Sequence, residues 1–470
     1  MLFLPELSLL GAGLTLFFFS LGKPGSTTTR NLAVSLAAIT LFVSLLCVNS
    51  EGTLFYSSYK VDFFSQIFKV LMAAATLVVL LFSGRLEGIR EDIQPEYYLF
   101  LFMSVLGLMM LVSSVELLAI FVSLELSSFA VYIMVPMRKP GKMAGAQVEA
   151  GIKYLLYGVV ATSFMLFGMS YIFGLTGSTN LGEIADKLAR MYNQPAAVVA
   201  VLLVLAGFFY KLALFPLHFW VPDVYEGASN ETTAFIAVVP KLAAVALLIR
   251  LVTLVTPDGN VMTKVLMVCA ILSMFYGNLS ALVQKDVKRL LGFSGISHAG
   301  FVLLGLLTFN ITGYATALYY IIGYVLMNLA CFLVICRVSE KGNNVSIDDL
   351  TGLHKRAPLL ALTLTIGLFA LAGIPPLVGF TGKFMLLVAA LKEGYIVLVT
   401  LAAINTGIAI YYYLSIVRVT FCTDSADRGD VTSDRLHSVL CFALVAIIII
   451  MGIFPSTFID VTTRAVQTLI

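Results

Sequence analysis

Residues 208–223 read Phe208-Phe-Tyr-Lys-Leu-Ala-Leu-Phe-Pro-Leu-His-Phe-Trp-Val-Pro-Asp223, at the far end of an apolar run that starts at Ala196. A lysine at bilayer depth costs roughly 2.5 to 3.5 kcal/mol on insertion scales, so Lys211 is expected to face a protein interior or a wet cavity. Pro216 lacks an N–H and its ring clashes with the carbonyl of Leu212, which predicts a break just after the lysine. A broken helix with a buried base is typical of ion-coupled transport sites. The alternative is a kinked helix whose lysine snorkels to the interface.

The composition predicts an all-α polytopic protein embedded in a lipid bilayer. The chain has 470 residues, of which 60% are hydrophobic and 12% are charged, with a mean hydropathy of +0.99. Soluble domains carry about 25% charged residues. The net charge of +3 argues against nucleic acid as a partner. We find no C-x-x-C pair, nucleotide loop, haem motif or metal box, so the chain is expected to hold no cofactor and no metal.

Apolar runs of about twenty residues are long enough to cross a bilayer. They predict fourteen spans joined by short connections, without a soluble domain. The spans lie near 2–21, 31–48, 63–83, 97–115, 116–136, 147–174, 196–221, 232–254, 261–283, 289–309, 313–337, 359–391, 395–420 and 438–458.

Basic residues are unevenly divided between the two sets of connections. The odd-numbered connections hold Lys23, Arg30, Arg85, Arg90, Arg138, Lys139, Lys142, Lys285, Lys288, Arg289, Arg337, Lys341, Lys355, Arg356, Arg418, Arg428 and Arg435. The even-numbered connections and the tail hold only Lys60, Lys187, Arg190, Arg250, Lys264, Lys392 and Arg464. Because cytoplasmic loops are enriched in lysine and arginine, both termini are predicted on the periplasmic side.

The twelfth span contains a second proline-broken run, Leu371-Ala-Gly-Ile-Pro-Pro-Leu-Val-Gly-Phe-Thr-Gly-Lys383, with its break at Pro375 and Pro376. Its Leu-Ala-Gly-Ile-Pro matches Leu-Ala-Leu-Phe-Pro in span seven. Matching spans five apart indicate two inverted five-helix repeats, spans 4–8 and 9–13. Chance similarity is the alternative, because Lys211 precedes its break and Lys383 follows its own. The predicted units are a three-helix segment 1–95, repeats 96–254 and 255–420, and a C-terminal helix 421–470.

Five basic residues remain at membrane depth: Lys69, Lys153, Lys211, Lys241 and Lys383. Lys69 lies early in its span and is interpreted as a snorkelling surface residue. The other four, with Glu125, form a charged row suited to proton transfer, because an opposite charge at 4 Å is worth about 4 kcal/mol at an effective dielectric of about 20. A static ion pair of Glu125 with Lys153 is the structural alternative.

Two histidines adjoin the row. His218 follows Lys211 by seven residues, which places both on one face only if the helix continues past Pro216. His298 lies in Phe293-Ser-Gly-Ile-Ser-His-Ala299. Each is either a proton carrier, since histidine titrates near neutrality, or a packed core residue. Trp220 suits the interfacial aromatic belt, and the tyrosines are interpreted as packing or lipid-facing residues.

Three stretches together resemble the antiporter-like membrane subunits of bacterial NADH-quinone oxidoreductase, respiratory complex I. They are residues 211–228, 285–300 and 371–384, and the likeness covers essentially all predicted spans. Asp223-Val-Tyr-Glu-Gly-Ala228 and Lys383 are similar to the subunit N branch. One departure is Ser229-Asn-Glu231, where the family usually has prolines.

The resemblance implies roles for the row: Glu125 and Lys153 as a modulating pair, Lys211 as input base, His218 and Lys241 as relays, Lys383 as terminal site, with His298 as a further relay candidate. It also implies a proton-translocating subunit of an enzyme in the bacterial inner membrane. NAD, FMN, iron–sulfur clusters and the quinone would belong to partner subunits, and other membrane subunits would adjoin this chain. The alternatives are a subunit of a cation/proton antiporter or membrane-bound hydrogenase, and a packing scaffold with inert ion pairs.

Overall fold

The computed structural model describes residues 1–22, 24–140, 145–191, 194–252, 260–422, 431 and 434–469. Lys23, Lys142 and Arg428, which entered the orientation prediction, lie outside the described residues. The N-terminal part consists of α1 (Leu4–Leu21), α2 (Ser26–Leu46), the antiparallel hairpin β1 (Gly52–Leu54) and β2 (Tyr59–Val61), and α3 (Phe63–Phe82).

The hairpin is followed at once by a capped helix. The Asp62 carboxylate accepts a hydrogen bond of 2.8 Å from the Ser65 amide, which satisfies one of the free N–H groups at the start of α3. This hairpin is not evident from the hydropathy pattern.

The elements of the middle of the chain are η1 (Glu91–Ile93), α4 (Gln94–Ser113), α5 (Leu117–Met134), η2 (Val135–Met137), α6 (Ala146–Thr176), α7 (Leu181–Leu188), α8 (Pro195–Leu212), α9 (Trp220–Gly227) and α10 (Asn230–Val252). The remaining elements are α11 (Asn260–Ala281), α12 (Val287–Leu306), α13 (Ile311–Val338), η3 (Ile347–Leu350), α14 (Leu353–Arg356), α15 (Pro358–Ala372), α16 (Val378–Lys392), α17 (Ile396–Cys422), α18 (Arg435–Ile453) and α19 (Pro455–Gln467).

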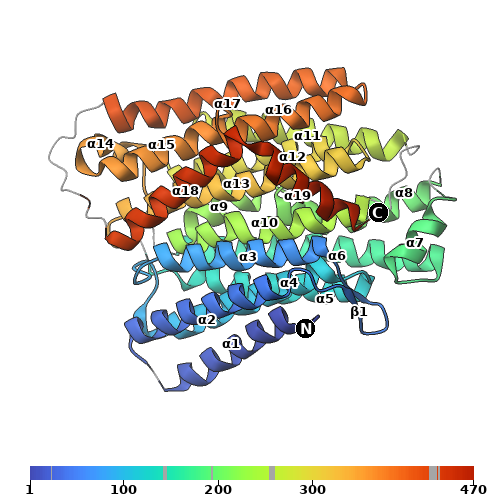
Figure 1. Cartoon of the computed structure of the whole chain (residues 1–470), viewed down its shortest axis with the longest axis horizontal. Coiled ribbons are helices and arrows are strands. Elements are labelled where there is room, and N and C mark those ends of the chain that lie inside the picture. Colours follow the sequence, from blue (N-terminus) through green and yellow to red (C-terminus); the bar gives the residue numbers. More distant parts are fainter. Residues whose placement is uncertain are drawn as a thin grey trace.

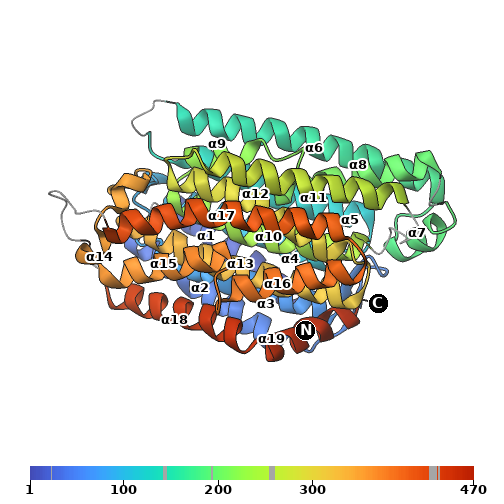
Figure 2. The ribbon, with the colours of Figure 1, turned by 90° about the horizontal axis from the view of Figure 1, so that it is seen from above.

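The long helices lie side by side along the longest axis of the molecule (Figure 1). Figure 2 shows them in layers, with α6 along one edge and α18 and α19 along the other. We call the end that carries the β1–β2 hairpin, α7 and Leu469 the terminal face. The opposite end, with η3 and α14, is the loop face.

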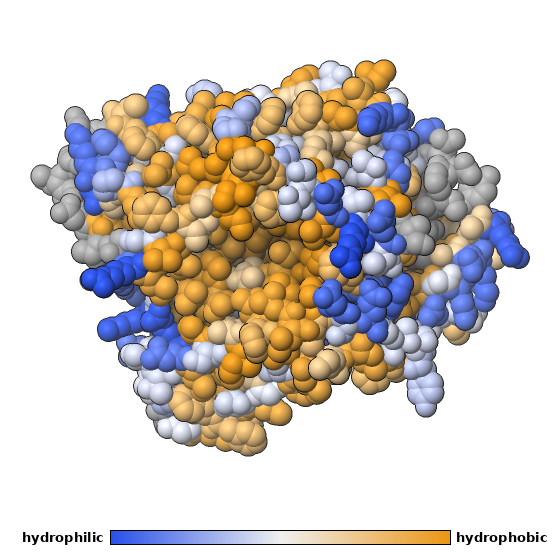
Figure 3. All heavy atoms as spheres, viewed as in Figure 1, coloured by the Kyte–Doolittle hydropathy of each residue, from blue (hydrophilic) through white to orange (hydrophobic). Residues whose placement is uncertain are grey.

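The prediction of an all-α membrane fold is confirmed. Thirteen of the described helices are long and apolar enough to cross a membrane. Two predicted spans are interrupted: 196–221 becomes α8, a loop and the short α9, and 359–391 becomes α15 and α16. Figure 3 shows an apolar belt between polar residues at the two ends, as expected for a bilayer-embedded bundle.

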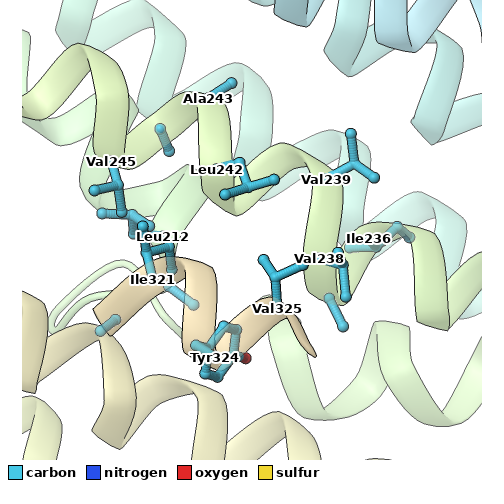
Figure 4. Close-up of a cluster of buried hydrophobic side chains, with 14 of the residues drawn as sticks. Leu212, Ile236, Val238, Val239, Leu242, Ala243, Val245, Ile321, Tyr324 and Val325 are labelled. Atoms are coloured by element: carbon cyan, nitrogen blue, oxygen red, sulfur yellow. The ribbon is translucent and has the colours of Figure 1, made fainter. Parts of the chain in front are cut away.

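The helices differ greatly in how far they are enclosed. The apolar window of α10 is 100% buried, whereas only 28% of the windows of α2 and α18 are buried. Figure 4 shows side chains of α10, among them Val238 and Leu242, packed with Ile321 and Val325 of α13. The centre of the bundle is therefore the contact between α10 and α13.

Two sequence-based interpretations are wrong at this level. Lys69 does not snorkel: it is 0% exposed and its ammonium lies 2.8 Å from Glu6 of α1. Trp220 is 1% exposed and lies inside the protein, so it does not belong to an interfacial belt. Both errors have the same cause, since the position of a residue along an apolar run does not show whether it faces lipid or the protein interior.

Candidate functional site: a buried charged row

The break after α8 is satisfied by protein groups. Ala213 adopts a left-handed conformation with φ 63°, which ends the helix, and the peptide bond between Phe215 and Pro216 is cis. The Phe215 amide donates a hydrogen bond of 2.9 Å to the Ser273 hydroxyl of α11. Non-helical backbone at membrane depth requires such a buried partner.

Lys211 ends α8 directly before this break. It is 2% exposed, and its ammonium donates a hydrogen bond of 3.0 Å to the Ser128 hydroxyl of α5. Glu125 lies one turn before Ser128 and interacts electrostatically with Lys211, beside the Thr162 hydroxyl. Glu125 Oε1 is buried and has no hydrogen-bond partner in the part of the chain that the structure describes. Glu125 and Lys211 therefore lie near enough to interact electrostatically.

Lys153 does not pair with Glu125, contrary to the expected modulating pair. Its ammonium lies 2.8 Å from Asp223 and 2.7 Å from Glu149, and its side chain is 38% exposed. The physical reason is the start of α6 at Ala146, which places Lys153 only two turns into the helix. Lys153 thus lies near the loop face, away from the row.

The loop face is hollowed beside this pair. A cleft of about 350 Å³ is lined by Lys153, Glu149, Asp223 and Glu226, with Arg138. Sequence reasoning missed the acidic side of this cleft, because Asp223 and Glu226 were used only to recognise a motif.

Arg289 of α12 bridges the two acidic residues of α9. Its guanidinium lies 3.1 Å from Asp223 and 2.6 Å from Glu226. Asp223 is therefore shared between Lys153 of α6 and Arg289 of α12.

Aromatic rings hold the other end of α9. The Trp220 ring stacks on Tyr154 of α6, with centroids 4.6 Å apart and an interplanar angle of 28°. Its indole N–H donates a hydrogen bond of 2.9 Å to the carbonyl of Tyr210, and the Tyr210 hydroxyl donates one of 2.7 Å to the Tyr154 carbonyl. This aromatic clamp of Tyr154, Tyr210 and Trp220 fixes α9 next to Lys211.

His218 lies in the loop between α8 and α9. It is 0% exposed, and its ring nitrogens have no hydrogen-bond partner among the described residues. The ring lies 4.2 Å from that of Tyr276 and 5.5 Å from that of Phe215. The helix ends at Leu212, so Lys211 and His218 do not share a helix face.

Lys241 occupies the middle of α10. It is 2% exposed, and its ammonium donates a hydrogen bond of 2.9 Å to the Tyr324 hydroxyl of α13. A cavity of about 10 Å³ adjoins Lys241, His298 and Tyr324, which is about the space that one water molecule needs.

His298 of α12 lies across this cavity. It is 4% exposed, with Nδ1 2.6 Å from the Tyr320 hydroxyl and Nε2 3.3 Å from the Tyr413 hydroxyl. Tyr413 also hydrogen-bonds Ser294. Sequence reasoning missed these tyrosines. The available signal was Tyr320 and Tyr324, four residues apart and hence on one helix face.

Lys383 of α16 faces the second break. It is 4% exposed, and its ammonium donates hydrogen bonds of 2.9 and 3.3 Å to the carbonyls of Leu371 and Ala372. These carbonyls end α15, where cations are favourable. The break itself runs through Gly373, with φ 87°, and the cis peptide bond between Pro375 and Pro376.

The arrangement is one of buried amines next to hydroxyl and carbonyl oxygens, suited to accepting and releasing protons. Within the described ranges, no group of three or more His, Cys, Asp or Glu residues is placed to hold a metal ion.

Comparison with known proteins places the chain in a family. Residues 114–409 match the model described as NADH:quinone oxidoreductase/Mrp antiporter, TM. NADH-quinone oxidoreductase subunit N 2 of Opitutus terrae is 49% identical over 99% of this chain and 98% of its own length.

Two solved structures share the fold. A chain of respiratory complex I from Thermus thermophilus is 29% identical, with a TM-score of 0.84 over 97% of this chain and 98% of that chain. A chain of the Mrp complex from Dietzia sp. DQ12-45-1b is 20% identical, with a TM-score of 0.86 over 99% and 96%, and this likeness concerns the fold alone. The predicted resemblance is confirmed: the chain belongs to the NADH:quinone oxidoreductase/Mrp antiporter family of membrane subunits.

Proposed function

We propose that this chain is the subunit N of a bacterial NADH-quinone oxidoreductase and translocates protons across the inner membrane. Its relatives named subunit N match over nearly the whole chain, and the solved complex I chain shares its fold. Electron transfer from NADH through FMN and iron–sulfur clusters to a quinone takes place in partner subunits. The chain itself supplies a proton route among other membrane subunits.

One observation supports the proton route above all. Lys211, Lys241 and Lys383 are each at least 96% buried, and their hydrogen bonds go to uncharged oxygens. An isolated buried ammonium is costly, so amines kept at this depth are suited to exchanging protons.

We assign Lys211 as the input base, with Glu125 as the carboxylate that modulates it. Lys241 and His298, beside the one-water cavity, carry the proton onward to Lys383. We assign His218 as a further relay, which needs a bound water to exchange protons with neighbouring groups. Lys153 is assigned to the cleft at the loop face.

The repeats and the orientation are part of the same proposal. Spans four to eight and nine to thirteen, within 96–254 and 255–420, form inverted units. The proline breaks after α8 and α15 are their corresponding positions. The three helices of 1–95 and the helix of 421–470 flank them. Both termini face the periplasm.

A subunit of a cation/proton antiporter or a membrane-bound hydrogenase is the second candidate. The Mrp chain has this fold, but its identity of 20% is far below the 49% of the subunit N relative. Genes for hydrogenase or cation-antiporter subunits beside this one would favour that candidate.

The decisive variant is Lys211→Ala in the assembled complex. We expect NADH oxidation to move fewer protons, because proton transfer by a positioned side chain is typically worth about 10²–10⁴-fold in rate. The measurement is proton uptake per NADH oxidised in proteoliposomes. Lys392→Ala, an exposed lysine at the end of α16, is the matched control. An unchanged ratio for Lys211→Ala contradicts the proposal.

A further inference from the structure

A buried ion pair lies outside the charged row. Glu6 of α1 and Lys69 of α3 are both 0% exposed, and Lys69 Nζ lies 2.8 Å from Glu6 Oε1. A buried pair requires further hydrogen bonds to offset the loss of hydration. The contact is ionic in character, because the Lys69 ammonium has no hydrogen-bond partner of good geometry in the described chain.

Tyr59 of the hairpin completes the pair. Its hydroxyl donates a hydrogen bond of 2.6 Å to Glu6 Oε1, and its ring lies 5.3 Å from the Lys69 ammonium. Burial, together with the neighbouring Glu6 carboxylate, raises the pKa of the Tyr59 hydroxyl well above its usual value. Tyr59 therefore remains a proton donor to Glu6.

Several buried polar atoms around the pair have no hydrogen-bond partner among the described residues. They are Glu6 Oε2, both side-chain polar atoms of Gln66, and the Ser113 hydroxyl oxygen. Gln66 lies one turn before Lys69 on α3, and Ser113 lies beside Tyr59. Buried polar groups are nearly always satisfied by protein or by ordered water. Donors and acceptors gathered in this way are suited to binding water.

The pair lies close to the terminal face. Three residues after Tyr59, the Asp62 carboxylate binds the Arg250 guanidinium through two contacts of 2.8 Å. Arg250 in turn lines a cavity of about 320 Å³, together with Lys60 and Asn180. The buried pair thus adjoins groups that open to the terminal face.

We propose that Glu6, Lys69 and Tyr59 form a second proton-exchanging site, which passes protons between the protein interior and the cavity at the terminal face. Transfer of a proton from Lys69 Nζ through bound water to Glu6 Oε2 converts the ammonium and carboxylate into a neutral amine and a neutral acid. The acid then releases its proton through bound water towards the cavity, and the amine regains a proton from the interior. The site deepens the proposed function and rests on it.

The site and the row adjoin the same helix, α10. This helix carries Lys241 in its middle and Arg250 in its last turn, and Arg250 is held by Asp62 at the start of α3. The start of α3, which carries Lys69, is therefore tied to a helix that the row also uses.

The test uses the intact complex in proteoliposomes, with Glu6→Gln, Lys69→Met and the double variant. We expect each single variant, and also the double variant, to lower proton translocation per NADH oxidised by about twofold or more, since a proton carrier contributes about 10²–10⁴-fold where no bypass exists. Glu51→Gln, an exposed carboxylate on the same face, is expected to change nothing.

The double variant separates this proposal from a purely structural pair. If the pair only holds α1 against α3, the neutral double variant regains normal translocation, and the proposal is overturned. The singles leave one buried charge unbalanced and can lose the complex, whereas the double variant is uncharged. Lys211→Ala, run in parallel, distinguishes the outcomes: a loss there with normal Glu6 and Lys69 variants overturns only the second site.

Discussion

Each buried amine of the row is matched to a particular kind of oxygen. Ser128 and Tyr324 offer hydroxyls to Lys211 and Lys241, and a hydroxyl either accepts from an ammonium or donates to a neutral amine. Among the described residues, the hydrogen bonds of Lys383 go to carbonyls, which accept but never donate. The first two lysines thus keep a partner in both protonation states, whereas Lys383 is held best when charged.

Tyr324→Phe tests this pairing. Removing the hydroxyl leaves the Lys241 ammonium without its hydrogen bond, which for a charged group is worth about 1.5–3 kcal/mol. We expect a lower proton yield per NADH oxidised from a complex that still assembles, since the ring is kept. Tyr411→Phe, a tyrosine of α17 that is 71% exposed, serves as control. A normal yield for Tyr324→Phe shows that the hydroxyl has no part in proton transfer.

At this scale, hydropathy predicted three of the buried lysines but not their partners, and it misplaced Lys153 and Lys69. Lys211, Lys241 and Lys383 are buried as expected. The Glu6–Lys69 pair was missed because each residue lies near the end of its apolar run. Contacts between helices that are distant in the chain decide whether such a residue faces lipid or protein. A single sequence does not show these contacts.

Different contacts hold the two ends of the short helix α9. At the loop face, Asp223 binds two partly exposed cations, and exposed ion pairs are worth only about 0.2–1 kcal/mol each. At the break, Trp220 is 1% exposed between two tyrosines. The aromatic end therefore supplies most of the stability, and the ionic end sets the orientation of α9.

Substitutions at the two ends should differ in cost. We expect Trp220→Ala to destabilise the protein by about 3–5 kcal/mol, the usual range for a buried large aromatic residue. Asp223→Asn should cost about 1 kcal/mol or less, and less still at high salt. Thermal unfolding of the purified complex at two salt concentrations measures both, with Asp186→Asn on exposed α7 as control. Equal costs at both ends would refute this division.

Proline chemistry explains why both breaks were predictable. Pro216 and Pro375 remove backbone donors at sites where the ring also blocks a helix, so the local sequence is sufficient. The position of Lys153 could not be predicted in this way, because it depends on where α6 begins. A shift of a few residues in that start moves a side chain from mid-membrane to the loop face.

Over the whole molecule, polar residues gather at two ends of an apolar belt (Figure 3). The loop face has Arg138, Lys355 and Arg356, and the terminal face has the hairpin and Leu469. In the proposed orientation, the excess of basic residues assigns the loop face to the cytoplasm.

Cysteine labelling in intact cells checks this orientation. In a Cys422→Ser background, which removes the exposed native cysteine, a membrane-impermeant maleimide is expected to label Ser57→Cys at the hairpin tip. Lys355→Cys is expected to react only after the membrane is opened. Both positions are exposed. The reverse pattern would invert the proposed topology and place the Glu6–Lys69 site on the cytoplasmic side.

The complete enclosure of α10 limits how the lipid bilayer can act on Lys241. Lipid acyl chains are kept from α10, the helix that bears Lys241, since every residue of its apolar window is covered by neighbouring helices. Changes in membrane thickness or fluidity reach that amine only by moving the outer helices, such as α2 and α18, against the centre. The Lys241 amine is thereby shielded from direct contact with the fatty-acid chains of the membrane.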